Sequence, residues 1–133
     1  MHKTNKTEEY VLLDILFEEV NYAKLVSLPI QSDFVPIIDQ PLNVNVPSLE
    51  DILGDILTAF APNTTGIPYF KKGDSMSTEI IKQLYDIGNL FDSVTDIETI
   101  KTTFYRFAKT EIAYRNSEGI NEIDVLQDIR LSQ

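Results

Sequence analysis

Residues 27–47 have the sequence SLPIQSDFVPIIDQPLNVNVP, with prolines at positions 29, 36, 41 and 47. Each proline fixes its own backbone, removes a hydrogen-bond donor and pushes the preceding residue towards an extended conformation. A helix cannot run through this stretch, so we predict an extended arm over residues 27–47. The arm is too apolar to be a linker exposed to water. We therefore expect its side chains to be buried against this protein or against a partner.

Length and composition indicate one domain over residues 1–133, because 43% hydrophobic residues suffice for a single modest core. The chain contains no cysteine, which excludes disulfides, thiolate metal sites and cysteine nucleophiles. It also lacks an apolar run of 18 residues and a signal-peptide pattern. We expect a soluble cytoplasmic protein, or one incorporated into a particle, without a membrane partner.

The net charge of −10 is concentrated towards both ends of the chain, while residues 61–115 are balanced. Such a field repels nucleic-acid phosphates and anionic lipids, and it favours basic partners. Lys101, Tyr105 and Lys109 follow each other at helical spacing, as on some nucleic-acid-binding surfaces. The overall charge favours a different interpretation, in which these bases meet an acidic segment of a neighbouring subunit or partner. Direct nucleic-acid binding is therefore not expected.

Periodicity predicts a first helix from Thr7 to about Val26. Its polar residues form one narrow strip, and apolar side chains occupy more than half of its circumference, so we expect it to pack on two sides. Glu19 would fall on its apolar side, where a carboxylate must be paired, protonated or at an interface. Two interpretations stay open for Glu19, a rim position between buried patches and an acid that recognises a partner.

A second helix is predicted from Ser48 to about Phe60, with Ser48 as N-cap and Asp51 three residues later. Residues 62–75 contain turn residues around a short apolar stretch and predict a loop with a small strand or hairpin. A third helix is expected over 76–87, with Gly88 just after its end. Thr95 and Glu98 form a capping-box pattern that opens a fourth helix to about Arg115.

The segment 120–131 fits both a helix start and a strand, and the strand would pair best with Leu42–Val46 because of its clean alternation. We favour the helix. The predicted fold is therefore mainly α: a small helical domain of four or five helices, with the long proline-punctuated extended arm 27–47 and room for a minor β-hairpin.

The sequence offers few groups for catalysis. His2 is the only histidine, and the five glycines form no phosphate-binding motif, so we predict no catalytic site, no cofactor and no metal site. Two carboxylate pairs at helical spacing, Asp14 with Glu18 and Asp51 with Asp55, could in principle hold Mg²⁺ or act as acid and base. A solvated face of an acidic protein is the interpretation we prefer for both pairs.

These observations favour a non-catalytic assembly or adaptor protein, by analogy with components of viral or other large particles. Its partner would be another protein or a second copy of the chain. The residues expected to bind the partner combine the arm with the first helix: Leu28, Ile30, Phe34, Val35, Ile37, Ile38, Leu12, Ile15, Glu19 and Tyr22.

Two other hypotheses remain open. An acidic inhibitor or immunity-type protein would bind a basic nucleic-acid-binding partner through five carboxylates, Asp14, Glu18, Glu50, Asp51 and Asp55, and salt would weaken that binding steeply. A metal-dependent enzyme would require stabilisation by Mg²⁺ or Mn²⁺.

Overall fold

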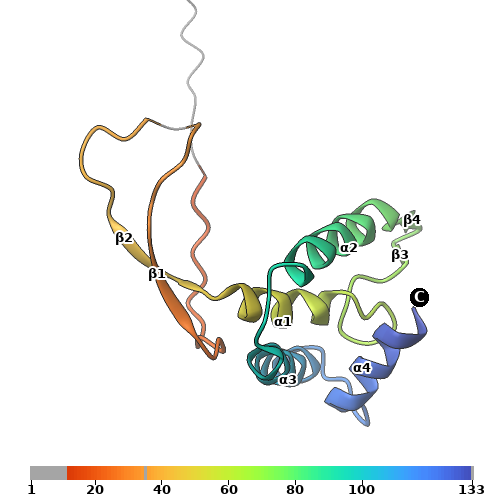
Figure 1. Ribbon diagram of the computed structural model, residues 1–133. Coiled ribbons are helices and arrows are strands. Elements are labelled where there is room, and N and C mark those ends of the chain that lie inside the picture. Colours follow the sequence, from red (N-terminus) through yellow and green to blue (C-terminus); the bar gives the residue numbers. More distant parts are fainter. Residues whose placement is uncertain (1–11, 35, 133) are drawn as a thin grey trace, which may run out of the picture.

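A computed structural model describes residues 12–34 and 36–132 of the chain. In this part it has four helices and two antiparallel strand pairs: β1 (Leu25–Pro29), β2 (Asn43–Pro47), α1 (Leu49–Ala59), β3 (Phe70–Lys71), β4 (Asp74–Ser75), α2 (Ser77–Phe91), α3 (Ile97–Tyr114) and α4 (Glu122–Leu131). The predicted mainly α class with a minor β component is confirmed. Figure 1 shows a helical body from which the hairpin of β1 and β2 stands out.

The core of the body lies between α1 and α3, with α4 closing one end. Gly54 of α1 permits this close approach, because a Cβ at that position would come within 2.7 Å of the Ile100 carbonyl oxygen in α3. The buried apolar side chains are Leu53, Ala61, Ile100, Phe104, Ala108 and Val125. None of the helices in the described residues is both long enough and apolar enough to cross a membrane.

Two helices begin at side-chain caps, and the first of these caps, Ser48, was predicted. The Ser48 hydroxyl accepts a hydrogen bond from the Asp51 N–H at 3.2 Å, which caps α1. Asn121 and Asp124 form a reciprocal capping box at the start of α4. The ambiguous segment 120–131 is thus helical, and the favoured interpretation is confirmed.

Two predicted helix boundaries are wrong. The helix α2 continues through Gly88 to Phe91, because this glycine keeps a helical backbone and does not adopt the positive φ of a C-terminal cap. At the start of α3, the N-cap is Asp96 and not Thr95. The Asp96 carboxylate accepts from the Thr99 N–H at 3.1 Å and from the Thr99 hydroxyl at 2.7 Å.

The predicted first helix is wrong over its described part, residues 12–26, and its beginning at residues 7–11 lies outside the described residues. Residues 12–24 run without regular structure, and β1 begins at Leu25. A helix there would need the N–H groups of Ala23 and Lys24 for its own ladder, but both donate to the Asp51 carboxylate. The helix propensity of this segment is therefore overridden by a tertiary contact.

The stretch 27–47 is not one extended arm but a hairpin with a long loop. The strands β1 and β2 pair antiparallel, with Val26 opposite Val46 and Leu28 opposite Val44. The same register is extended by two bonds, from the Ser48 N–H to the Lys24 carbonyl at 3.0 Å and from the Ile30 N–H to the Leu42 carbonyl at 2.8 Å. The alternative pairing of 42–46 with residues 120–131 does not occur.

The register explains why prolines are compatible with these strands. In an antiparallel pair, every second residue points its N–H and C=O towards the partner strand. The printed bonds of Ser48 and Ile30 place the even-numbered residues in that inward position. Pro29 and Pro47 are odd-numbered and face outward, so their missing N–H groups remove no ladder bond.

This register makes a prediction for two neighbouring positions of β2. Val44→Pro should remove an inward N–H and open the ladder, whereas Asn45→Pro removes an outward N–H and should leave it intact. Amide exchange of Ile30, whose N–H donates to Leu42, measures the result by NMR. We expect protection of Ile30 to be lost in the first variant only. Equal loss in both variants would contradict the register.

Candidate partner-binding surface

The hairpin has one fully apolar face. Side chains of directly paired residues share a face of a sheet, and successive residues alternate between faces. The even-numbered positions of β1, β2 and their flanks therefore form one surface, which we call the hairpin face: Val26, Leu28, Ile30, Leu42, Val44 and Val46. Leu28 and Ile30 are exposed, as is Leu42, so the described chain does not cover this face towards the hairpin loop.

The loop of the hairpin adds further apolar side chains. Phe34 and Ile38 are 94% and 98% exposed, and Ile37 is exposed as well. Val35, also predicted to bind the partner, lies outside the described residues. The loop thus carries large apolar groups that make no use of the protein's own core.

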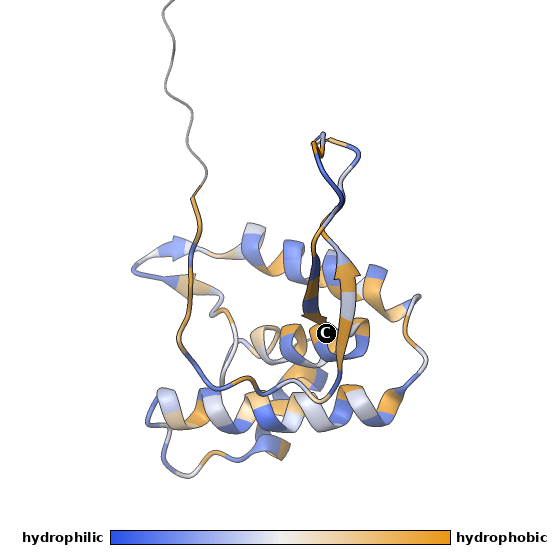
Figure 2. Cartoon of the chain, turned by 90° about the vertical axis from the view of Figure 1, so that its left-hand side faces the viewer, coloured by the Kyte–Doolittle hydropathy of each residue, from blue (hydrophilic) through white to orange (hydrophobic). Residues whose placement is uncertain are grey.

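A second exposed apolar segment precedes the hairpin. Leu12 and Ile15, both predicted partner residues, are exposed, together with Leu13, Leu16, Phe17 and Val20. Glu19 is exposed too. Because no helix forms here, the expectation that Glu19 would lie on an apolar helix face is wrong. Figure 2 shows residues 12–20 and the hairpin as two separate arms, which rise from the helical body on the same side.

Tyr22 fixes the first arm to the body. Its ring packs against Phe107 of α3 with centroids 5.1 Å apart, and its hydroxyl donates to Asp55 Oδ2 at 3.1 Å. Burial, followed by the charge of Asp55, raises the pKa of Tyr22 to about 12. Tyr22 was predicted to bind a partner, but its side chain is engaged within the chain, so we leave it out of the surface.

Asp51 is the anchor at the base of both arms. Its side chain is fully buried. It accepts hydrogen bonds from the N–H groups of Ala23 and Lys24 at 2.7 and 2.8 Å, from the Ser48 hydroxyl at 2.8 Å and from the Thr103 hydroxyl. One carboxylate therefore joins the first arm, the end of β2, the start of α1 and the middle of α3.

The hydrogen bonds decide the charge state of Asp51. Burial by itself raises the pKa of this carboxyl group, but the donors from Thr103, Ala23, Ser48 and Lys24 together outweigh it and hold the pKa below its usual value. The interpretation of Asp51 as part of a solvated face is wrong. A carboxylate with four donors is also not arranged to share Mg²⁺ with Asp55.

Two more acids of the inhibitor hypothesis are engaged within the chain. Asp55 accepts from Tyr22, and burial raises its pKa, with the charge of Glu111 adding to the effect and the Tyr22 hydrogen bond opposing it. The Glu50 carboxylate accepts from the Thr95 N–H at 3.3 Å. With Asp51 buried, only Asp14 and Glu18 of the five are exposed and outside these contacts, on the first arm.

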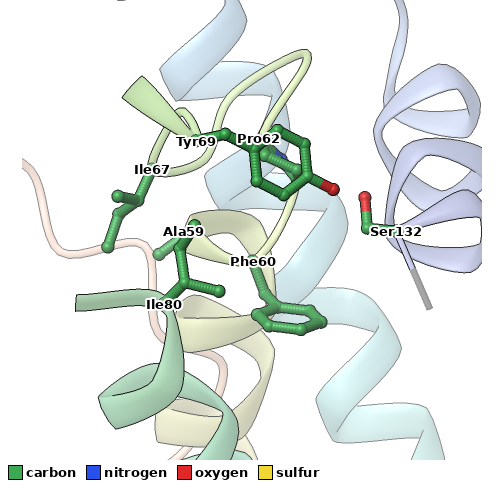
Figure 3. A pocket seen from close by; sticks show the side chains of 7 residues that line it. All are labelled: Ala59, Phe60, Pro62, Ile67, Tyr69, Ile80 and Ser132. Carbon is green, nitrogen blue, oxygen red and sulfur yellow. The ribbon is translucent and has the colours of Figure 1, made fainter. Parts of the chain in front are cut away.

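One cavity at the end of the body is small and apolar. Figure 3 shows its lining, which comes from the end of α1, the loop after it and the first turn of α2, with Ser132 at the end of the described chain: Ala59, Phe60, Pro62, Ile67, Tyr69, Ile80 and Ser132. Its volume of about 20 Å³ corresponds roughly to one water molecule. Within residues 12–34 and 36–132, no cluster of three or more acidic or histidine side chains could hold a metal ion.

Comparisons with protein-family models, with curated proteins and with solved structures found no match to this chain.

The anchor makes a prediction for stability. Asp51→Ala leaves four donors without an acceptor, so we expect a loss of about 3 kcal/mol in the free energy of unfolding, measured by urea titration. Asp39→Ala removes an exposed carboxylate in the hairpin loop and serves as the control, with an expected change within about 0.5 kcal/mol. Similar small losses in both variants would contradict the anchor.

The lowered pKa of Asp51 makes a second prediction. An unfolded aspartate titrates near about 3.9, so the unfolded chain binds a proton at a higher pH than the folded one. The stability from Asp51 should be fully present above that value and be lost as the pH falls through the lower folded pKa. Urea titrations between pH 2.5 and 6 measure this loss. Asp51→Asn should depend less steeply on pH below 4, and an unchanged slope would refute the assignment.

Proposed function

We propose that this chain is an assembly or adaptor protein, which works through protein–protein contact and not through catalysis. Its two arms would dock on a neighbouring copy or on a larger partner, as in a structural component of a viral or other large particle. The observation that supports this most is the exposed apolar surface of the arms. It comprises the part of the hairpin face towards the loop, the loop residues Phe34, Ile37 and Ile38, and the apolar side chains of residues 12–20.

The energetics of the hairpin support docking. A two-stranded hairpin is at best marginally stable in water by itself. Full burial of one large apolar side chain is worth about 1.5–3 kcal/mol, and side chains such as Leu28, Ile30 and Phe34 gain little of this in the isolated chain. A partner that covers them would supply the missing burial and stabilise the hairpin at the same time.

The common base of the arms favours a single partner site. Asp51 binds the N–H groups of Ala23 and Lys24, directly before β1, and the hydroxyl of Ser48, directly after β2. Both arms leave the body on the same side in Figures 1 and 2. One partner surface can therefore meet both, with an entropic advantage over two independent contacts.

The charges of the arms describe the partner's surface. Residues 12–47 contain five acids, Asp14, Glu18, Glu19, Asp33 and Asp39, and one base, Lys24. A complementary surface is apolar at its centre and basic at its rim. An acidic inhibitor would also bind a partner with a basic rim. However, three of the five carboxylates that this hypothesis needs are engaged within the chain, so no observation favours it over assembly.

The mass in solution tests the proposal. By light scattering coupled to size exclusion, we expect a defined oligomer that persists in 1 M salt, where charges are screened within about 3 Å. The double variant Phe34→Asp, Ile38→Asp should shift it towards the monomer. Both side chains are almost fully exposed, so their replacement should not unfold the body.

The control adds the same charge without removing apolar surface. Gln31→Asp with Gln40→Asp places two acids in the same loop and should leave the oligomer unchanged. An oligomer that dissociates in high salt and responds equally to both double variants would favour an electrostatic contact. A monomer under all conditions would exclude a second copy as the partner of the arms.

A further inference from the structure

The helix α2 is apolar on two sides, and the body covers only one of them. Its inner side packs on α1 through half-buried side chains, among them Ile80, Ile87 and Leu90. The other apolar side, which we call the α2 outer face, consists of residues at helical spacing: Ile81, Leu84, Tyr85, Gly88 and Phe91. Its four large side chains are exposed by 63%, 54%, 71% and 63% respectively. Figure 1 shows α2 at the margin of the body, away from the two arms.

Gly88 lies near the middle of the α2 outer face and has no structural reason within the described chain. A glycine inside a helix costs about 1 kcal/mol relative to alanine. In α1 the cost is explained, because a Cβ on Gly54 would clash with α3. At Gly88 the backbone is helical and a Cβ would meet nothing within 4 Å. Among residues 12–34 and 36–132, no closely packed neighbour explains this glycine.

We propose that the α2 outer face binds the same face of a second copy, with the two helices antiparallel around a two-fold axis between Asp86 and Ile87. In this arrangement Tyr85 of each copy lies over Gly88 of the other, since the two positions are equidistant from the axis. Each aromatic ring would fill the flat site that the missing side chain leaves, as in other self-complementary interfaces. This contact is separate from the arms and does not depend on their proposed role.

The charges beside the α2 outer face favour the antiparallel direction. Lys82 lies at the N-terminal end of this face and Asp92 at its C-terminal end. The two-fold axis brings each Lys82 to within about one residue rise, 1.5 Å along the axis, of the level of Asp92 in the other copy. Two symmetric ion pairs result. A parallel pairing would separate Lys82 from Asp92 of the other copy by ten residue rises, about 15 Å along the axis, so neither ion pair could form.

The size of the contact sets the expected affinity. Four exposed side chains on one helix bury on the order of 500 Å² per copy, against about 800 Å² in a standard interface. We therefore expect a dissociation constant on the order of 10–100 µM. Such a contact suits an assembly in which several weak interfaces act together.

Sedimentation equilibrium tests the α2 contact. The protein used is the double variant Phe34→Asp, Ile38→Asp, in which the contacts of the arms are weakened. Self-association in this variant therefore reports on α2, and a failure of the α2 proposal is distinguishable from a failure of the proposed role of the arms. Gly88→Arg should raise the dissociation constant at least tenfold, because the side chain enters the two-fold contact. It should not unfold α2, since arginine favours helices and the site is open. Thr102→Arg, exposed on α3 and outside the α2 outer face, is the control and should change it less than threefold.

Charge reversal then tests the direction. Lys82→Glu and Asp92→Lys should each weaken self-association several-fold, and their combination should restore it. Because the chain has no cysteine, a mixture of Tyr85→Cys and Gly88→Cys proteins should form a disulfide-linked dimer upon oxidation, faster than either protein alone. A monomeric parent at 500 µM, an unaffected Gly88→Arg variant, or preferential cross-linking of Gly88→Cys with itself would overturn the proposal.

Discussion

The arrangement of the whole molecule depends on one buried carboxylate. Asp51 stands three residues after the cap of α1, where an acid is favourable for local reasons. From there it accepts hydrogen bonds from a chain segment 28 residues earlier and from a hydroxyl 52 residues later. It therefore converts a local capping position into the junction of the arms, the first helix and the core. Asp128 plays a comparable role at the other end of the body, where it accepts from the N–H of Asn63 and the hydroxyl of Thr64, both at 2.8 Å.

The parts of the fold that sequence could predict are those decided within a few residues. The start of α1 at Ser48 follows from a side chain that bonds its own backbone. The helical state of 120–131 was predicted from apolar spacing, and the structure adds a local capping box of Asn121 and Asp124. The predicted helix over 7–26 failed in its described part because periodicity only states that apolar side chains would share a face. It does not state that a surface exists to cover that face, and here the N–H groups of Ala23 and Lys24 bind a distant acid instead.

The candidate surface, too, was predictable from the sequence only in part. Composition was sufficient to select the apolar residues between Ser27 and Pro47, and Leu28, Ile30, Phe34, Ile37 and Ile38 are exposed in the structure. The hairpin was not foreseen, because its loop of residues 30–42 is far longer than the turns that make hairpins recognisable. The pattern of Asn43 to Val46 did indicate a strand, but its true partner β1 lies where a helix to about Val26 and an unpaired extended arm from Ser27 were predicted. The α2 outer face was missed because a buried and an exposed apolar helix face look alike in sequence.

The outward position of two prolines also decides how the hairpin can be recognised. Each of its edges carries one proline, Pro29 on β1 and Pro47 on β2. A strand from another chain that added itself to either edge would meet a position without an N–H group and with a ring in the way. Continuous extension of the sheet into a larger one, and with it uncontrolled stacking of hairpins, is therefore hindered. A partner must therefore recognise the side chains of the hairpin face and not its backbone. The shape of this side-chain surface then determines which partner fits.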